Sequence, residues 1–326
     1  MATANATFTE MVTTTLRAHR KEIADNVSNH NALHARMTKK GNKETEDGGY
    51  EIVMPLDYAE NSTYQRYSGY EVLNVQASEV LSAAKYDWKQ AAVHVAASGR
   101  ELRQNSGKNA LIKLASARLK NAMRTAANQM SSDLYSDGTE DGGKQIGGLQ
   151  AIVADDGLGT VGGINSSTFS FWQNKVQSAA SPLQGGAGIT PSSSTMASLM
   201  HPLWLELVRG TDKPDLIISS NNYFQYFWES LTDLQRYADK SDEATQGFSR
   251  LKYVTADVIH DGGSGIPDSH MYFLNTDYLK LVEHADAQWS EVEEMRPINQ
   301  DSAVIPIIWM GNLCCSNRAL QGVLKA

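Results

Sequence analysis

Cysteine is nearly absent from this chain of 326 residues, which has only the adjacent pair Cys314 and Cys315. Adjacent cysteines rarely bridge, because a disulfide between them is strained. Two sulfur ligands do not make a zinc site either, so a disulfide framework and a cysteine zinc site are both excluded. We expect both side chains to be small core residues in a strand, which fits a reducing cytoplasm.

Long apolar runs are absent too. No stretch of about 18 apolar residues occurs, so we expect no membrane-spanning helix and no membrane partner. The N-terminus lacks the basic and apolar regions of a secretory signal peptide. Apolar residues nevertheless make up 41% of the chain and charged residues 20%, which indicates a globular protein of two domains or one elaborate domain.

Positive charge is scarce overall, because 29 Lys and Arg residues face 37 Asp and Glu residues and the net charge is −8. A dedicated nucleic-acid binder is usually basic, so this balance argues against tight binding of nucleic acid but not against proximity to it. The exception is the polar N-terminal region, which reads either as a solvated arm or weak helix or as an arm that reaches along a neighbouring subunit. Its cations are Arg17, Arg20, Lys21, Arg36, Lys39, Lys40 and Lys43.

The signatures of catalysis are missing. There is no Gly-x-Ser-x-Gly elbow and no Walker loop, and His201 and His260 are isolated. A Gly-x-Gly-x-x-Gly occurs at 157–162, but the residues after it favour a strand and no ribose-binding acid follows, so a dinucleotide site is not expected. His30 and His34 have helical spacing without a third metal ligand. We therefore expect no catalytic residue, no cofactor and no metal.

What the chain does have is a tyrosine-rich, strand-patterned segment over 48–99 that is too long to be a turn. A projecting hairpin buries little of itself alone, so we expect it to lie on another subunit. Tyrosine is common at interfaces; the alternative is that Tyr64, Tyr67 and Tyr70 pack on the protein's own sheet. The return strand is expected from about Lys85 to Ala97. The candidate inter-subunit contacts are Tyr50, Tyr58, Tyr64, Tyr67 and Tyr70.

A long amphipathic helix follows at once. Ser98 and Glu101 form a Ser-x-x-Glu capping box, which predicts a helix start. We expect the helix over 98–137, with a break near 105–107. Its apolar residues step by three or four positions and make one stripe that can pack against a sheet or another helix. That stripe is Ile112, Ala115, Leu119, Ala122, Ala126, Met130 and Leu134.

The rest of the chain mixes helices with mostly antiparallel strands, which indicates an α+β fold. Glu291 and Glu293 fall on one face of an expected strand, where a solvated edge or a salt bridge to a neighbouring subunit is favoured over a cation site. The expected elements are helices over about 191–209 and from about 221, strands over 214–219 and 251–258, a hairpin of 271–274 with 279–282, and a strand-rich end over 303–324.

Short strings mark the order of these elements. Gly-Gly-Leu-Gln-Ala-Ile-Val stands at 147–153, Phe-Trp-Gln-Asn at 171–174 and Pro-Asp-Leu-Ile-Ile at 214–218, after a basic arm, a long β-loop and a helix ending in Asp137-Gly138. Over nearly the whole chain this order resembles that of the major capsid proteins of tailed double-stranded DNA bacteriophages, which have the Hong Kong 97-like fold. The resemblance rests on the order of the elements and on these short strings, and not on a catalytic signature.

The resemblance implies a domain organisation and a set of partners. Hexamers and pentamers of the chain would close an icosahedral shell around DNA, assembled in the cytoplasm of a host bacterium, with the basic arm facing the lumen and touching the packaged DNA weakly. A separate scaffolding protein, a portal and decoration proteins are the other partners it suggests. The implied parts are an N-terminal arm over 1–47, an extended β-loop with flanking strands over 48–97, a spine helix and peripheral domain over 98–147, a mainly axial domain over 148–290 and C-terminal strands over 291–326.

Two alternatives to a phage capsid protein stay open at this point. The first is an encapsulin-like shell that stores protein cargo. The second is an enzyme of unfamiliar α+β fold whose site is assembled from distant residues. Double-stranded DNA inside a shell, protein inside a shell, or a discrete small oligomer with a concave polar pocket would separate the three.

Overall fold

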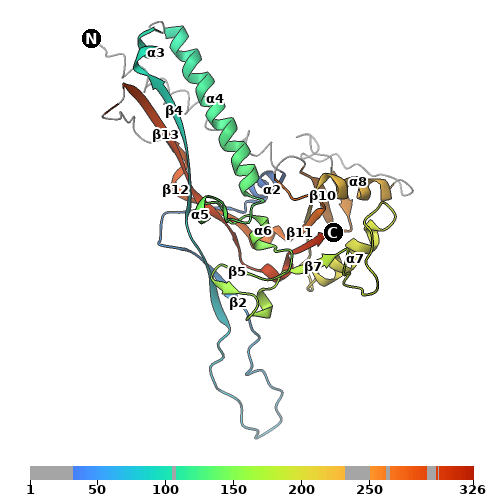
Figure 1. Cartoon of the computed structure of the whole chain (residues 1–326). Coiled ribbons are helices and arrows are strands. Elements are labelled where there is room, and N and C mark those ends of the chain that lie inside the picture. The colour runs from blue at the N-terminus through green and yellow to red at the C-terminus, as the bar shows by residue number, and fades with distance from the viewer. Residues whose placement is uncertain (1–31, 105–107, 232–249, 262–264, 292–298, 300) are drawn as a thin grey trace.

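The computed structural model describes residues 32–104, 108–231, 250–261, 265–291, 299 and 301–326. Figure 1 shows an elongated molecule, in which helix α4 and strands β4 and β13 extend toward one end. A hairpin that contains β2 projects from the opposite end, and a compact part with α7 and α8 lies to one side. None of the helices among the described residues is both long enough and apolar enough to cross a membrane.

The larger sheet has six strands in the order β7-β14-β11-β8-β10-β9. Strand β8 pairs in parallel with β10 and antiparallel with β11. Helices α7 and α8 bury apolar side chains such as Leu203 and Phe227 against Ile217 and Phe273 of this sheet. The bounds are β7 Lys175–Ser178, β8 Leu216–Ser219, β9 Arg250–Tyr253, β10 Ala256–His260, β11 His270–Leu274, β14 Gly322–Lys325, α7 Met196–Glu206 and α8 Asn221–Ser230.

The second sheet has four strands in the order β1-β12-β13-β4, with bounds β1 Lys43–Glu46, β12 Leu279–Glu291, β13 Ser302–Cys315 and β4 Lys89–Ser98. Strand β1 runs parallel to β12, and the other pairs are antiparallel. Cys314 and Cys315 are buried at the end of β13, which confirms their prediction as core residues. Burial raises the pKa of the Cys315 thiol to about 12, so the thiol is protonated and unreactive at neutral pH.

The projecting hairpin consists of β2 Ile52–Asp57 and β3 Leu81–Tyr86. Strand β2 alternates buried and exposed residues, as expected for a strand with one packed face. The prediction of a single return strand over 85–97 was wrong. The chain changes sheets at Asp87 and Trp88, because β3 pairs with β2 whereas β4 pairs with β13.

The predicted long helix is present as α3 Gly99–Gln104 and α4 Lys108–Asp133. The capping box is confirmed, because the Glu101 backbone N–H donates to Ser98 Oγ and the Ser98 backbone N–H donates to the Glu101 carboxylate. The apolar stripe is confirmed from Leu119 to Leu134, all of it buried. The predicted break at 105–107 lies outside the described residues.

A buried arginine organises the glycine-rich connection after α5 Glu140–Gly143 and α6 Leu149–Ile152. Arg318, in the 3-10 turn η3 Arg318–Leu320, is 0% exposed and donates to the backbone oxygens of Ile152, Leu158 and Trp172. The glycine motif at 157–162 leads into a small hairpin of β5 Thr160–Val161 and β6 Ile164–Asn165 and then the 3-10 turn η1 Ser170–Trp172, not into a helix. This confirms that the motif is a connection and not a dinucleotide fingerprint.

Two further strand predictions were wrong in detail. The expected strand over 251–258 is a hairpin of β9 and β10, which turns at Val254 with a φ of 54°. The expected hairpin of 271–274 with 279–282 does not form, because β11 belongs to the six-stranded sheet and β12 to the four-stranded one. The residues between them, which form the 3-10 turn η2 Thr276–Tyr278, link the two sheets.

Candidate assembly surfaces

The first candidate surface is the loop over 58–80 that joins β2 to β3 and projects from the body (Figure 1). Tyr64, Tyr67 and Tyr70 are 81%, 65% and 107% exposed, and Val72 and Val75 are also exposed. The three tyrosines therefore do not pack on the protein's own sheet. Apolar side chains at this density on a projecting loop indicate a binding surface.

The contacts inside the loop are polar and short in range. Gln65 Nε2 donates to the carbonyl oxygen of Val72 at 3.2 Å, and the Ser68 backbone N–H donates to Glu71 at 3.2 Å. The backbone N–H of Tyr58 donates to Val80 O at 3.0 Å, where the β2–β3 ladder ends. The loop therefore has a defined base, and its large apolar side chains, such as Tyr64 and Tyr70, stay exposed.

Tyr50 and Tyr58 flank this loop and differ from each other. Tyr50 is 94% exposed just before β2. Tyr58 stacks on Phe171, with ring centroids 5.3 Å apart, so it ties the loop base to η1. Contact of either tyrosine with a neighbouring subunit stays a prediction.

The hairpin is anchored to the body at the end opposite the loop over 58–80. Tyr86 donates its hydroxyl hydrogen to Cys315 O at 2.8 Å and accepts from the Cys315 backbone N–H at 3.1 Å. The Lys85 backbone N–H donates to Gly162 O at 2.9 Å. Gly162 has a φ of 58°, and a Cβ there would lie 2.7 Å from the Ala84 side chain, so glycine is required for this close approach.

The second candidate surface is an open groove of about 520 Å³ between β4 and α4. Arg118 lines the groove, donates to Ala96 O at 2.6 Å and pairs with Glu101 at 2.7 Å. The hydrogen bond from Arg118 is the main cause that lowers the pKa of Glu101 to about 2. The groove is lined by Val93, His94, Val95, Ala96, Arg118, Asn121, Ala122 and Thr125.

The third candidate surface is the basic N-terminal region, of which residues 32–46 are described. Helix α2 Ala32–Lys40 buries Leu33 and Met37, so this part is docked on the body. Burial, followed by the nearby charge of Lys43, lowers the pKa of His34 to about 4 and keeps its ring neutral. Lys39 is exposed. The predicted cations Arg17, Arg20 and Lys21 lie outside the described residues.

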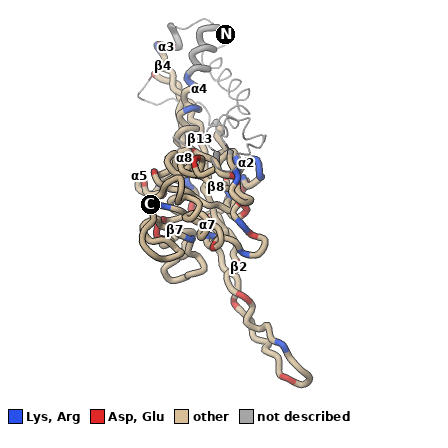
Figure 2. Tube along the Cα trace, turned by 90° about the vertical axis from the view of Figure 1, so that its right-hand side faces the viewer, with Lys and Arg blue, Asp and Glu red and all other residues tan. Residues whose placement is uncertain are grey.

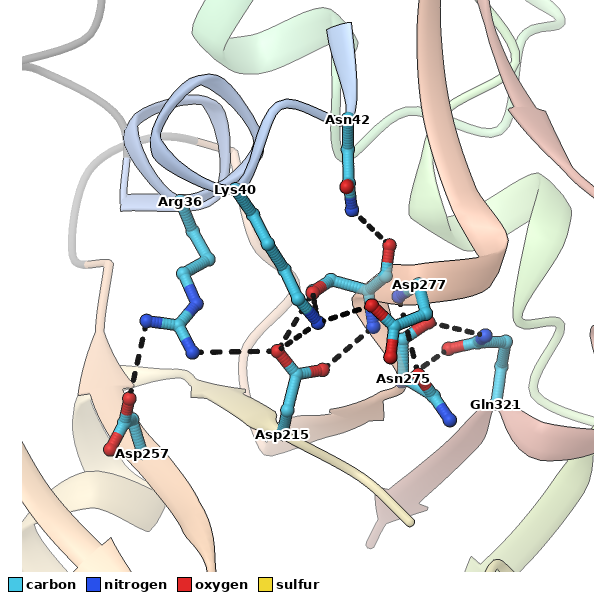
Figure 3. Close-up of polar contacts among 9 residues, drawn as sticks. Arg36, Lys40, Asn42, Asp215, Asp257, Asn275, Asp277 and Gln321 are labelled. Atoms are coloured by element: carbon cyan, nitrogen blue, oxygen red, sulfur yellow. Dashed lines mark hydrogen bonds and ion pairs between the residues drawn. The ribbon is translucent and has the colours of Figure 1, made fainter. Parts of the chain in front are cut away.

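Arg36 and Lys40 make ion pairs within the subunit (Figure 3). Arg36 lies 3.4 Å from the carboxylates of both Asp215 and Asp257. Lys40 lies 3.2 Å from Asp215 and 2.6 Å from Asp277. Further along, Lys43 pairs with Glu283 at 2.8 Å. These carboxylates were not predicted as partners. The sequence signal for a docked helix is the i, i+4 spacing of Arg36 and Lys40, which lies beside the same spacing of Leu33 and Met37.

The charges are unevenly distributed over these surfaces. Figure 2 shows Lys and Arg gathered at α2, and few charges of either sign along the projecting hairpin. The predicted acidic contact Glu291 is the last residue of β12, and Glu293 lies outside the described residues. Among the described residues, no group of three or more His, Cys, Asp or Glu side chains is placed to hold a metal ion.

Comparison with known proteins gives a match only at the level of structure. No protein-family model matches the sequence, and no curated protein matches it significantly. A chain of the capsid asymmetric unit of cyanophage A-1(L) matches with a TM-score of 0.61 and 14% identity, over 87% of this chain and 90% of that one. The chain has the Hong Kong 97-like capsid fold. This confirms the fold class predicted from the order of elements.

Two further structures with this fold match at similar coverage. A chain of the capsid of a native GTA particle has a TM-score of 0.52 and 10% identity, over 88% of each chain. A chain of Mycobacterium phage Bobi has a TM-score of 0.51 and 8% identity, over 88% of this chain and 89% of that one. At such identities the Hong Kong 97-like fold is the shared property, and each residue role must be argued from this chain.

Proposed function

We propose that the protein is a structural major capsid protein, which assembles as hexamers and pentamers into an icosahedral shell that encloses phage DNA. The observation that carries this proposal is a capsid fold with an exposed, tyrosine-rich loop that buries none of Tyr64, Tyr67 and Tyr70 in its own subunit. In a shell, a second copy would cover that loop. The role is structural and not enzymatic, and the place of action is the virion, after assembly in the cytoplasm of the host.

The groove between β4 and α4 is the surface on a neighbouring copy that fits the loop best. The loop over 58–80 carries three acidic residues and one arginine, so it is net negative. The lining of the groove includes one cation, Arg118, which is partly exposed and also pairs with Glu101. Complementary charge fixes the register of such a contact, and the apolar floor, which includes Val93 and Ala122, can receive tyrosine rings.

The basic N-terminal region remains a candidate lumen-facing arm. Its described part has Arg36, Lys40 and Lys43 in ion pairs, so their charge is balanced within the subunit. Weak contact with packaged DNA would therefore depend more on Arg17, Arg20 and Lys21. Replacing these three by alanine should change the DNA content of particles without changing the unfolding of the subunit, and unchanged DNA content would contradict a lumen-facing role.

Other predicted partners are a scaffolding protein, a portal and decoration proteins. The predicted acidic contact Glu291 lies at the end of β12, where a neighbouring copy or a decoration protein could pair with it, and Glu293 is proposed as a second acidic contact from its sequence position alone. The predicted division into arm, extended loop, spine, peripheral and axial parts is kept as a working description of how the subunit is placed in the shell.

Electron microscopy of the full chain, expressed alone and with candidate scaffolding proteins, tests the proposal. Closed shells, tubes or rings of capsomers are the expected products, and nuclease-protected DNA in particles from infected cells is the expected content. Protein cargo without DNA would favour a storage shell. A uniformly small oligomer under every condition, with and without scaffolding proteins, would overturn the proposal.

A further inference from the structure

Residues 32–46, which we call the strap, contact parts of the chain that are far away in sequence. Helix α2 carries two adjacent stripes, with Leu33 and Met37 buried in the main core and the cations Arg36 and Lys40 directed at carboxylates (Figure 3). Lys40 and Asp215 are separated by 175 positions, and Lys40 and Thr276 by 236. The strap is thus held by apolar burial on one side and by charge on the other.

The strap touches both sheets. Arg36 pairs with Asp215, just before β8, and with Asp257 in β10, so it binds the six-stranded sheet. At the other end of the strap, β1 is the edge strand of the four-stranded sheet, and Lys43 pairs there with Glu283 of β12. Residues 32–46 therefore span the junction from one sheet to the other.

Between these ends the strap closes over the segment that links the sheets. Lys40 Nζ lies 3.1 Å from Thr276 Oγ1 and 2.6 Å from Asp277, and Asn42 Nδ2 donates to Thr276 O. Asp215 accepts from the backbone N–H and the hydroxyl of Thr276, both at 2.7 Å. On the far side, Gln321 holds Asn275 through two hydrogen bonds. The linking segment at Asn275–Asp277 is therefore fixed by polar contacts on both sides.

Partial release of the strap is unfavourable, because two of the carboxylates that pair with it are buried. The side chains of Asp257 and Glu283 are only 5% and 2% exposed. Glu283 also accepts from Trp309 Nε1 at 3.0 Å, but a buried carboxylate that loses its cation is strongly destabilised. Because Arg36 in α2 and Lys43 in β1 pair with different carboxylates, release of either element alone leaves one of these buried carboxylates without its cation.

We propose that the strap is an ion-pair clasp, which fixes the angle between the six-stranded and the four-stranded sheet. With the clasp closed, the link at Asn275–Asp277 is held and the two sheets move as one body. With the clasp open, the link becomes a hinge. The proposal concerns the subunit itself and does not depend on the identity of the shell or its contents.

Hydrogen exchange of the full chain tests whether the ion pairs close the clasp. In Lys40→Glu a third carboxylate would face Asp215 and Asp277, and exchange of the β1 amides should become about tenfold faster or more. Adding Asp277→Lys should slow that exchange again. The matched control is Lys144→Glu, the same charge reversal at an exposed lysine on the turn after α5. Exchange in Lys40→Glu equal to that of the control, or no slowing in the double variant, would overturn the proposal.

A second variant guards against loss of folding. If Lys40→Glu does not fold, Lys40→Met removes the ammonium and keeps the apolar stem, and β1 exchange should rise about threefold or more. No increase over Lys144→Met would overturn the role of the ion pairs.

Distance measurements test the angle directly. Spin labels at Gln225 of α8 and Lys120 of α4, both exposed, report on elements packed against the two different sheets. The native cysteines are buried and should not label. In the folded Lys40 variant the distance distribution should broaden relative to the Lys144 control. An unchanged distribution, with faster exchange at β1, would show that the strap binds without setting the angle and would overturn the proposal.

Discussion

The loop over 58–80 and the strap over 32–46 are both peripheral segments, but they satisfy their side chains in opposite ways. The strap buries Leu33 and Met37 and pairs its cations with carboxylates of its own chain. The loop leaves Tyr64, Tyr67 and Tyr70 exposed and has only short polar contacts of its own. The strap is thus satisfied inside the subunit, whereas the loop keeps exposed apolar side chains that we propose a second copy covers.

The largest expected effect comes from removing the loop. Replacing residues 58–80 by Asn-Gly joins Asp57 to Leu81, which already face each other in the hairpin, and Asn-Gly suits a two-residue hairpin turn. We expect the subunit to fold with unchanged circular dichroism and to form no particles in electron microscopy. Particles formed in normal yield would show that the loop is dispensable for assembly. They would contradict the view that the loop, unlike the strap, is completed by a second copy.

The next effect comes from breaking the strap's buried pair. Lys43→Met leaves the Glu283 carboxylate buried without its cation, and we expect the free energy of unfolding in urea to fall by about 3 kcal/mol. Adding Glu283→Gln removes the stranded charge and should recover at least part of that loss. Lys144→Met serves as control. A loss in Lys43→Met no larger than in the control would mean that the strap contributes little.

A pH dependence distinguishes the two segments as well. Burial holds the pKa of His34 at about 4 against an ordinary value of 6.5, so the folded subunit binds fewer protons than the unfolded chain between those values. Stability is therefore full well above pH 6.5 and falls as pH drops toward 4, by about 1.4 kcal/mol at pH 5.5. Urea unfolding at several pH values checks this. His34→Gln should flatten the slope, and an equal slope in both proteins would contradict the assignment.

The smallest effect on the subunit is expected at the loop tip. Tyr67→Ala should change the free energy of unfolding by less than about 0.5 kcal/mol, because the side chain is exposed. Its effect should appear instead as a higher protein concentration needed for assembly, measured by light scattering. Tyr58→Ala is the matched control, because Tyr58 stacks on Phe171 and its loss should destabilise the subunit. Equal stability losses in the two variants would contradict the distinction between tip and base.

Local sequence signals predicted much of the fold. The capping box at Ser98 and the apolar stripe from Leu119 to Leu134 are patterns within a few turns of one helix, and both are confirmed. The exposed tyrosine loop was also predicted, because a long strand-like segment cannot bury itself. These features need no knowledge of distant residues.

Features that depend on distant pairing were missed. Asn275–Asp277 has the composition of a hairpin turn, and the sequence between 271 and 282 cannot show that β11 and β12 enter different sheets. The strap was read as solvated or interface-bound, because the carboxylates that hold Arg36 and Lys40 lie far along the chain. The turn at Val254 was missed because a β-branched residue rarely adopts a positive φ.

Photo-crosslinking from the loop tip tests the central claim most directly. A photoreactive phenylalanine in place of Tyr67, in assembled particles, should join two copies of the chain, with the crosslink mapping to β4 or α4 of the second copy. Crosslinks within one chain only, from particles that assemble normally, would contradict the claim that another copy covers the loop.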